Sequence, residues 1–262
     1  MDSTLQSFER LLTIMDELRE KCPWDKEQTP ESIRPLTIEE TYELSDAILD
    51  KDLSGIRKEL GDLLLHIVFY AKIAAEQKAF DMKGVIDGLC DKLVYRHPHV
   101  FGDAEAANAG EVIKSWEQLK LTEKDGNKTV LSGVPKTLPA LIKAQRVQSK
   151  ARAVGFDWEK REQVWDKVHE ELAELQQEID SMNKDNMEAE FGDLLFSIVN
   201  AARLYKIDPE TALERTNKKF ISRFGYLEQK TIKQGRPLTE MTLAEMNGIW
   251  EEAKAAEKGE KK

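Results

Sequence analysis

Two pairs of acidic side chains in the first half of the chain have a spacing that suits a divalent cation. Glu40 and Glu43 are three residues apart, as are Glu59 and Asp62, so each pair projects from one face of a predicted helix. The short connection between these helices predicts an antiparallel hairpin, in which the four carboxylates converge. Four unpaired anions would repel one another, and desolvating them is costly, so a cation resolves the conflict. Oxygen ligands without thiolate or imidazole favour Mg²⁺ or Mn²⁺ over zinc.

The same acidic pattern occurs again at a constant offset of 131 residues. The second set comprises Glu171, Glu174, Glu190 and Asp193. A single ExxE pair is common on solvated helix faces, but a solvated face has no reason to keep both pairs in phase after duplication. A glycine precedes each aspartate, at Gly61 and Gly192, although glycine inside a helix costs about 1 kcal/mol relative to alanine. We therefore interpret the chain as two copies of one cation-binding unit, with another helix or a ligand close to each glycine.

The elements that must position these residues are predicted to be helices throughout. Only 14 glycines and 8 prolines interrupt 262 residues rich in Leu, Ala, Glu and Lys. We expect an all-α fold with two domains, 1–123 and 138–262, and a linker at 124–137. Pairing of two hairpins would give four-helix-bundle-like cores. The apolar seam of the first hairpin is expected to contain Leu44, Ile48, Leu60, Leu64 and Ile67. The predicted helices cover 5–20, 36–49, 54–75 (with Ser54 as the N-cap), 82–95, 111–123, 138–152, 161–182, 186–205, 209–229 and 243–258.

The overall composition excludes several classes of protein. Lys and Arg total 39 against 49 Asp and Glu, a formal net charge of −10, which argues against a general nucleic-acid binder. The longest apolar stretch is too short to cross a membrane, and the first residues do not resemble a signal peptide. Cys22 and Cys90 are expected to be free thiols, so we expect a cytoplasmic protein.

Further motifs accompany the repeated carboxylates, namely CPWD at 22–25, RHPHVF at 96–101 and VGFDW at 154–158. With EExxE and ExxD occurring twice, the chain resembles the MazG family of the all-α nucleoside triphosphate pyrophosphatases. The resemblance implies Mg²⁺-dependent hydrolysis of nucleoside triphosphates to monophosphate and pyrophosphate, with Mn²⁺ as a possible substitute. It also implies a homodimer built from paired domains.

The resemblance further implies a role for individual residues of the second copy. The metal ligands would be Glu171, Glu174, Glu190 and Asp193, and a second site, in the first copy, would use Glu40, Glu43, Glu59 and Asp62. Attack by water on the α-phosphorus would use Glu170 or Glu171 as the base. The first copy keeps Lys92 and Arg96 but lacks the Asn-Lys-Lys run found at 217–219, so its activity is in doubt. Residues expected to hold or act on the substrate are Lys167, Asn217, Lys219, Arg223 and Trp250.

Two other classes of function remain open at this stage. A di-iron carboxylate bundle would use the same kind of helix pair, but it usually carries Glu-x-x-His, and no histidine follows a motif glutamate by three residues. A non-enzymatic helical adaptor would use the repeats only for dimerisation. Iron content and triphosphate turnover separate these alternatives from a pyrophosphohydrolase.

Overall fold

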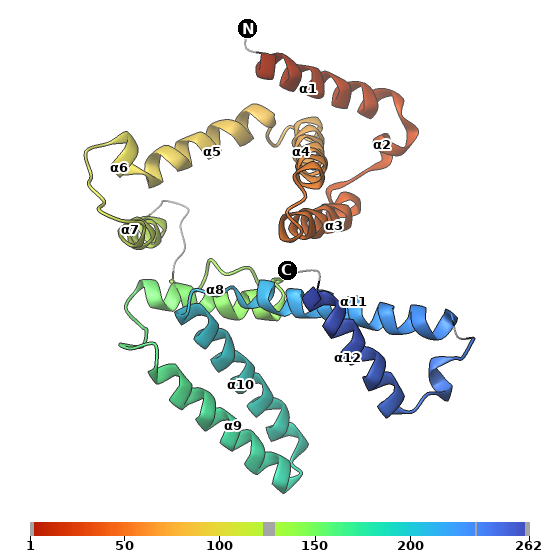
Figure 1. The fold of residues 1–262 in the computed structure, drawn as a ribbon. Helices are drawn as coiled ribbons and strands as arrows, with labels where there is room; N and C mark the ends of the chain where they lie inside the picture. The colour runs from red at the N-terminus through yellow and green to blue at the C-terminus, as the bar shows by residue number, and fades with distance from the viewer. Residues whose placement is uncertain (1–2, 123–128, 234, 260–262) are drawn as a thin grey trace. The chain divides into compact units, whose positions relative to one another are not determined.

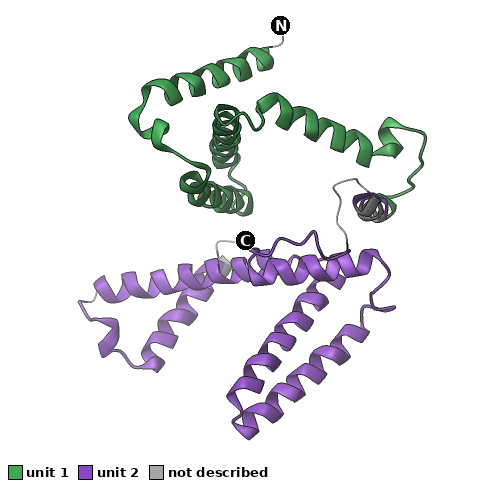
Figure 2. Cartoon of the chain, turned by 180° about the vertical axis from the view of Figure 1, so that it is seen from behind, with its two compact units in different colours: residues 1–112 green, residues 113–262 purple. Residues whose placement is uncertain are grey.

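The computed structural model describes residues 3–122, 129–233 and 235–259, and all regular secondary structure in these ranges is helical (Figure 1). The predicted all-α class is therefore confirmed. The chain divides into unit 1, Met1–Val112, and unit 2, Ile113–Lys262 (Figure 2). Residues 124–128 of the predicted linker lie outside the described ranges, and 129–137 form turns. None of the helices in the described ranges is both long and apolar enough to cross a membrane.

Unit 1 is built around the pair of helices α3 and α4, and its core lies where α1 packs on α4. The core contains Met15, Ile33, Val68, Phe69 and Ile73. Arg19 on α1 ties the unit together by donating to the backbone oxygens of Asp25 and Gln28 and to the carboxylate of Glu76. The helices are α1 (Ser3–Lys21), α2 (Pro23–Glu27), α3 (Pro30–Leu49), α4 (Leu53–Glu76), α5 (Met82–Arg96) and α6 (Pro98–Phe101), followed by α7 (Ala109–Thr122), which spans the division between the units.

Prolines begin three helices of unit 1, which the sequence patterns did not predict. Pro23, Pro30 and Pro98 each occupy the first turn, where a missing backbone N–H costs nothing. Helix α3 starts six residues before the predicted position 36 because Thr29 caps it, and Pro35 lies inside it. The N-cap of α4 is Asp52, which accepts from the backbone N–H of Ser54, so the prediction of Ser54 as the cap was wrong.

Unit 2 repeats the central helix pair of unit 1 and adds α8 and the pair of long helices α11 and α12 (Figure 1). Helices α9 and α10 pack along each other around Val164, Val168 and Ala201. Helix α8 packs on α10, and α12 packs on α11. The helices are α8 (Ala140–Ala153), α9 (Gln163–Ser181), α10 (Lys184–Leu204), α11 (Pro209–Lys233) and α12 (Leu243–Gly259), with a 3₁₀ turn, η1 (Leu238–Glu240), before α12.

A part-buried ion pair fixes the loop that precedes α9. Arg203 on α10 donates to both carboxylate oxygens of Asp157, at 2.5 and 3.2 Å, and Arg152 lies 3.3 Å from the same carboxylate. The pKa of Asp157 lies below its ordinary value because these contacts with arginine and a backbone hydrogen bond outweigh its desolvation. The pair therefore joins the VGFDW segment to α10.

The turns within the two hairpins have the same local geometry although their side chains differ. Lys51 and Met182, at equivalent positions of the repeat, both adopt the left-handed conformation, with φ of 58° and 57°. The next residue caps the following helix in each copy, Asp52 in unit 1 and Asn183 in unit 2. The backbone path from the first helix to the second is therefore retained in both copies.

Apolar side chains predicted to fill the seam of the first hairpin are instead exposed. Ile48, Leu60, Leu64 and Ile67 all face solvent, so that prediction was wrong for these four residues. The equivalent residues of unit 2 are exposed too, namely Ile179, Phe191, Leu195 and Ile198. Apart from the backbone of the same helix and the neighbouring residues, no atom in the described ranges lies within 4 Å of a Cβ built on Gly61 or Gly192. The predicted close neighbour of each glycine is therefore not another helix of the same described chain. Both hairpins thus present an open apolar face.

Candidate metal centre

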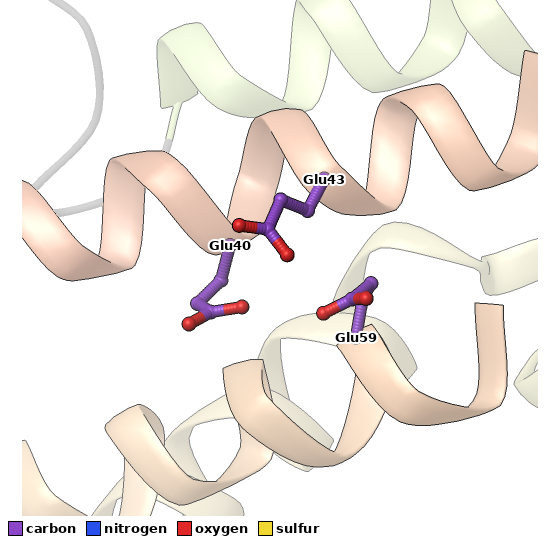
Figure 3. Close-up of side chains that lie close together, drawn as sticks. All are labelled: Glu40, Glu43 and Glu59. Carbon is purple, nitrogen blue, oxygen red and sulfur yellow. The ribbon is translucent and has the colours of Figure 1, made fainter. Parts of the chain in front are cut away.

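Three glutamates of unit 1 converge between α3 and α4 (Figure 3). Glu40 and Glu43 reach into the space from successive turns of α3, and Glu59 reaches in from α4. One carboxylate oxygen of each lies within 4.8 Å of the others. We call this group the unit 1 triad.

Unit 2 contains the equivalent group, the unit 2 triad, formed by Glu171 and Glu174 on α9 and Glu190 on α10. Its oxygens also lie within 4.8 Å of one another. Glu171 is buried, whereas its counterpart Glu40 is half-buried and the buried member of the unit 1 triad is Glu59, on the other helix of the hairpin. The predicted convergence of carboxylates from two helices is thus present in both copies.

The fourth predicted ligand of each copy lies beside its triad rather than within it. Asp62 raises the pKa of Glu40 through its charge, and Asp193 does the same to Glu190. Both aspartates are therefore close enough to contribute to the field of the cluster. Their role as direct ligands remains a prediction.

One carboxylate in each cluster has an oxygen that lacks a partner. Glu40 Oε2 and Glu190 Oε2 are buried and make no hydrogen bond to any described residue. Desolvation, followed by the charges of neighbouring carboxylates, raises the pKa of both groups. Buried oxygens of this kind need a hydrogen-bond donor or a cation. The donor set, three to four carboxylates without sulfur or imidazole, fits a hard divalent ion such as Mg²⁺ or Mn²⁺.

A lysine accompanies each triad, but the two lysines occupy non-equivalent positions. In unit 2, Lys167 lies 2.8 Å from Glu170 and 2.7 Å from Glu171, both on its own helix α9. These two carboxylates raise the pKa of Lys167. In unit 1, Lys58 on α4 lies 2.9 Å from Glu59 and 3.7 Å from both Glu43 and Asp62. Lys167 was predicted from the sequence to hold the substrate, whereas Lys58 was not predicted to take part in a site.

The remaining residues predicted to bind substrate lie on α11 and α12. Arg223 contacts the carboxylate of Glu257 and lies 5.8 Å from the ring centroid of Trp250. The ring of Trp250 is 5.0 Å from that of Phe220. Lys219 is exposed, and the exposed Asn217 donates to Glu214. Arg223 and Trp250 therefore meet, as a cationic and an aromatic group on facing helices.

The structure does not bring the α11–α12 residues to the unit 2 triad. Helices α11 and α12 form one arm and the α9–α10 hairpin forms another, and both views show the two arms diverging from α8 (Figures 1 and 2). The shared role of these residues and the triad in binding one substrate therefore stays a prediction. The contact of Glu257 with Arg223 was not predicted from the sequence, because Glu257 belongs to none of the repeated motifs.

Comparison with known proteins identifies the family of this chain. The model of the MazG nucleotide pyrophosphohydrolase domain matches twice, at residues 28–101 and 159–226, which contain the two triads. A nucleoside triphosphate pyrophosphohydrolase of Escherichia coli (strain K12) is 43% identical over 97% of this chain and 99% of its own length. The nucleoside triphosphate pyrophosphohydrolase/pyrophosphatase MazG of Thermotoga maritima is 45% identical over 95% of this chain and 96% of its own length. The chain therefore belongs to the MazG nucleotide pyrophosphohydrolase domain family, with two copies of the domain.

Proposed function

We propose that this chain hydrolyses nucleoside triphosphates to monophosphate and pyrophosphate at the unit 2 triad, with Mg²⁺ as the cofactor and Mn²⁺ as a substitute. Family membership and relatives named nucleoside triphosphate pyrophosphohydrolase support an enzyme of this kind. The observation that carries the proposal is the convergence of the carboxylates of Glu171, Glu174 and Glu190. The chain also has a formal net charge of −10. A triphosphate cannot approach such a cluster unless cations lie between the two sets of anions.

In this proposal Glu171, Glu174 and Glu190 hold the cation, and Asp193 completes the set. When bound, the cation would neutralise charge on phosphate oxygens and would lower the pKa of water in the site. Water attacks the α-phosphorus, the bond from that phosphorus to the bridging oxygen breaks, and pyrophosphate leaves with the electron pair. Glu170 accepts the proton of the attacking water, because it stands outside the triad while Lys167 holds it beside Glu171.

The substrate would be held by groups on the second arm of unit 2. Lys219 and Arg223 are four residues apart on α11, so both can face one phosphate chain. Trp250 provides a flat ring for a base, next to Arg223. Because these residues lie apart from the triad, we propose that the enzyme is a homodimer in which the exposed faces of the hairpins pair.

The test is a product assay with a panel of nucleoside triphosphates in the presence of Mg²⁺, in which pyrophosphate and orthophosphate are measured separately. We expect pyrophosphate and monophosphate in equal amounts. Glu174→Gln should lower kcat/KM by about a thousandfold, which corresponds to about 4 kcal/mol of lost transition-state stabilisation. The matched variant is Glu43→Gln, at the equivalent position of unit 1, and it should change kcat/KM by less than about threefold.

Three outcomes would contradict the proposal. Release of orthophosphate would place the attack at the γ-phosphorus instead. Full activity of Glu174→Gln, with loss of activity in Glu43→Gln, would move the reaction to unit 1. Absence of turnover for every nucleotide, in a protein whose thermal stability is the same with and without Mg²⁺, would favour the helical adaptor.

A further inference from the structure

The two triads differ in where the nearest ammonium group comes from. Lys58 Nζ contacts three carboxylates of unit 1, two from its own helix α4 and Glu43 from α3 across the hairpin. It donates to both oxygens of Glu59, at 2.9 and 3.2 Å. It therefore lies where the carboxylates converge.

The equivalent position in unit 2 is occupied by Ala189, an exposed residue on α10. The ammonium of unit 2 comes from Lys167, which pairs with Glu170 and with one triad member, both on its own helix. The position equivalent to Lys167 in unit 1 is Leu36. Each copy thus has its own lysine, but only Lys58 joins carboxylates from both helices of its hairpin.

An ammonium among these oxygens competes with a divalent cation. Both need the same carboxylate oxygens, and two positive charges a few ångströms apart repel even in a partly solvated site. One exposed ion pair contributes little, and the side chain of Lys58 is 65% exposed. Three simultaneous pairs form a network, however, and the ammonium is tethered, so a divalent ion must displace it each time it binds.

We propose that Lys58 is a built-in counter-ion of the unit 1 triad, so that this triad takes a divalent cation more weakly than the unit 2 triad does. The inference rests on the proposed function, because it assumes that the unit 2 triad binds Mg²⁺. Lys58 replaces part of the charge that a metal ion would otherwise provide. Unit 1 can thereby keep the geometry of its hairpin without a bound ion.

The test exchanges the charge between the two equivalent positions and measures Mn²⁺ binding to the full chain by calorimetry and electron paramagnetic resonance. The unit 1 triad is observed in a Glu171→Gln/Glu174→Gln background, with and without Lys58→Ala. The unit 2 triad is observed in a Glu40→Gln/Glu43→Gln background, with and without Ala189→Lys. Arg57→Ala is the matched control, because it removes one positive charge from the neighbouring exposed position of α4. Circular dichroism confirms that each variant stays helical.

We expect Lys58→Ala to tighten Mn²⁺ binding at the unit 1 triad by at least about tenfold and Arg57→Ala by less than about threefold. Ala189→Lys should weaken binding at the unit 2 triad by about tenfold. Equal effects of Lys58→Ala and Arg57→Ala would overturn the inference, as would a unit 1 triad that binds Mn²⁺ equally with and without Lys58. No binding at the unit 1 triad in any variant would also overturn it. The pyrophosphohydrolase proposal would survive all of these results, since none of them concerns cation binding at the unit 2 triad of the wild-type chain or the products of triphosphate turnover.

Discussion

Arg223 and Glu257 form a forked ion pair between α11 and α12, with nitrogen–oxygen distances of 2.7 Å and 3.2 Å. This pair raises the pKa of Arg223. A carboxylate and a phosphate present similar oxygens to a guanidinium group. A phosphate that binds Arg223 through the same Nε and Nη2 groups must therefore first displace Glu257.

We predict that Glu257→Gln lowers the KM for ATP by about three- to tenfold and leaves kcat within about twofold of the wild-type value. The amide keeps the shape of the side chain but removes the charge that competes with the triphosphate. Steady-state kinetics of pyrophosphate release measure the effect. Glu251→Gln is the control, since it removes a nearby charge without touching the fork. An unchanged KM would mean that Arg223 does not bind the phosphates.

Mg²⁺ should stabilise unit 2 against unfolding. At a concentration about a hundred times the dissociation constant, binding adds about 2.7 kcal/mol to the free energy of unfolding. The rise in melting temperature should disappear in Glu190→Gln, which loses a triad oxygen, and persist in Glu188→Gln, an exposed position on the same helix. Differential scanning calorimetry with and without Mg²⁺ provides the measurement. An identical rise in both variants would rule out Glu190 as a ligand.

The pair of Arg203 and Asp157 should matter for folding rather than for turnover. Their side chains are only 7% and 18% exposed, so replacement of Asp157 removes the anionic partner of a desolvated guanidinium that still donates to Asn200. We expect Asp157→Asn to lower the free energy of unfolding by about 3 kcal/mol in urea denaturation. The exposed pair of Arg161 and Glu162 offers a comparison, and Glu162→Gln should leave the free energy of unfolding almost unchanged. If both variants lost a similar free energy of unfolding, the Arg203–Asp157 pair would have no special role in stability.

The segment between α11 and α12 should be sensitive to acid. Hydrogen bonds from Arg236, and then from the backbone and hydroxyl of Thr242, lower the pKa of Glu245 to about 2. A carboxyl whose pKa is depressed in the folded state contributes stability that is present above its unfolded pKa of 4.5. That contribution is lost as the pH falls from 4.5 towards 2.

The free energy of unfolding of wild type should therefore exceed that of Glu245→Gln by a constant amount above about pH 5, and the difference should shrink below it. Urea denaturation of both proteins across this range provides the comparison. If the difference in free energy of unfolding stayed constant down to about pH 3, the contacts of Glu245 would not be the source of the acid sensitivity.

A charge on the exposed face of the unit 2 hairpin should break the proposed homodimer. Leu195 is 57% exposed, so aspartate at this position costs a monomer little but cannot be buried against a second copy. We expect Leu195→Asp to halve the mass measured by light scattering and to lower pyrophosphate release. Glu188→Gln serves here too as the control. A wild-type protein of monomeric mass with full activity would remove dimerisation from the proposal.

Much of this fold could be predicted from the sequence because helix periodicity and the repeat reinforce each other. The three-residue spacing of Glu40 and Glu43 fixes a shared face, and the short turn after α3 brings Glu59 to the same level. The predicted start of α3 at residue 36 was wrong, because Pro35 lies inside a helix that begins at Pro30.

The cationic partners could not be predicted, because their contacts link distant parts of the chain. Lys58 looks like any surface lysine in a helix, and only the packing of α3 on α4 brings it to Glu43. Arg203 and Asp157 are 46 residues apart, and Arg223 and Glu257 are 34 apart. Nor does periodicity distinguish an apolar stripe that fills a core from one that stays exposed, as Leu60 and Leu64 do.

The left-handed residues at the hairpin bends, Lys51 and Met182, have a consequence for how such a protein can change. One additional residue in either bend would rotate the helix that follows by about 100° about its axis. The third glutamate would then swing away from its two companions while every helix remained intact. Loop length in these bends is therefore under far tighter constraint than loop composition, and the retained bend geometry keeps the acidic groups of both copies in register.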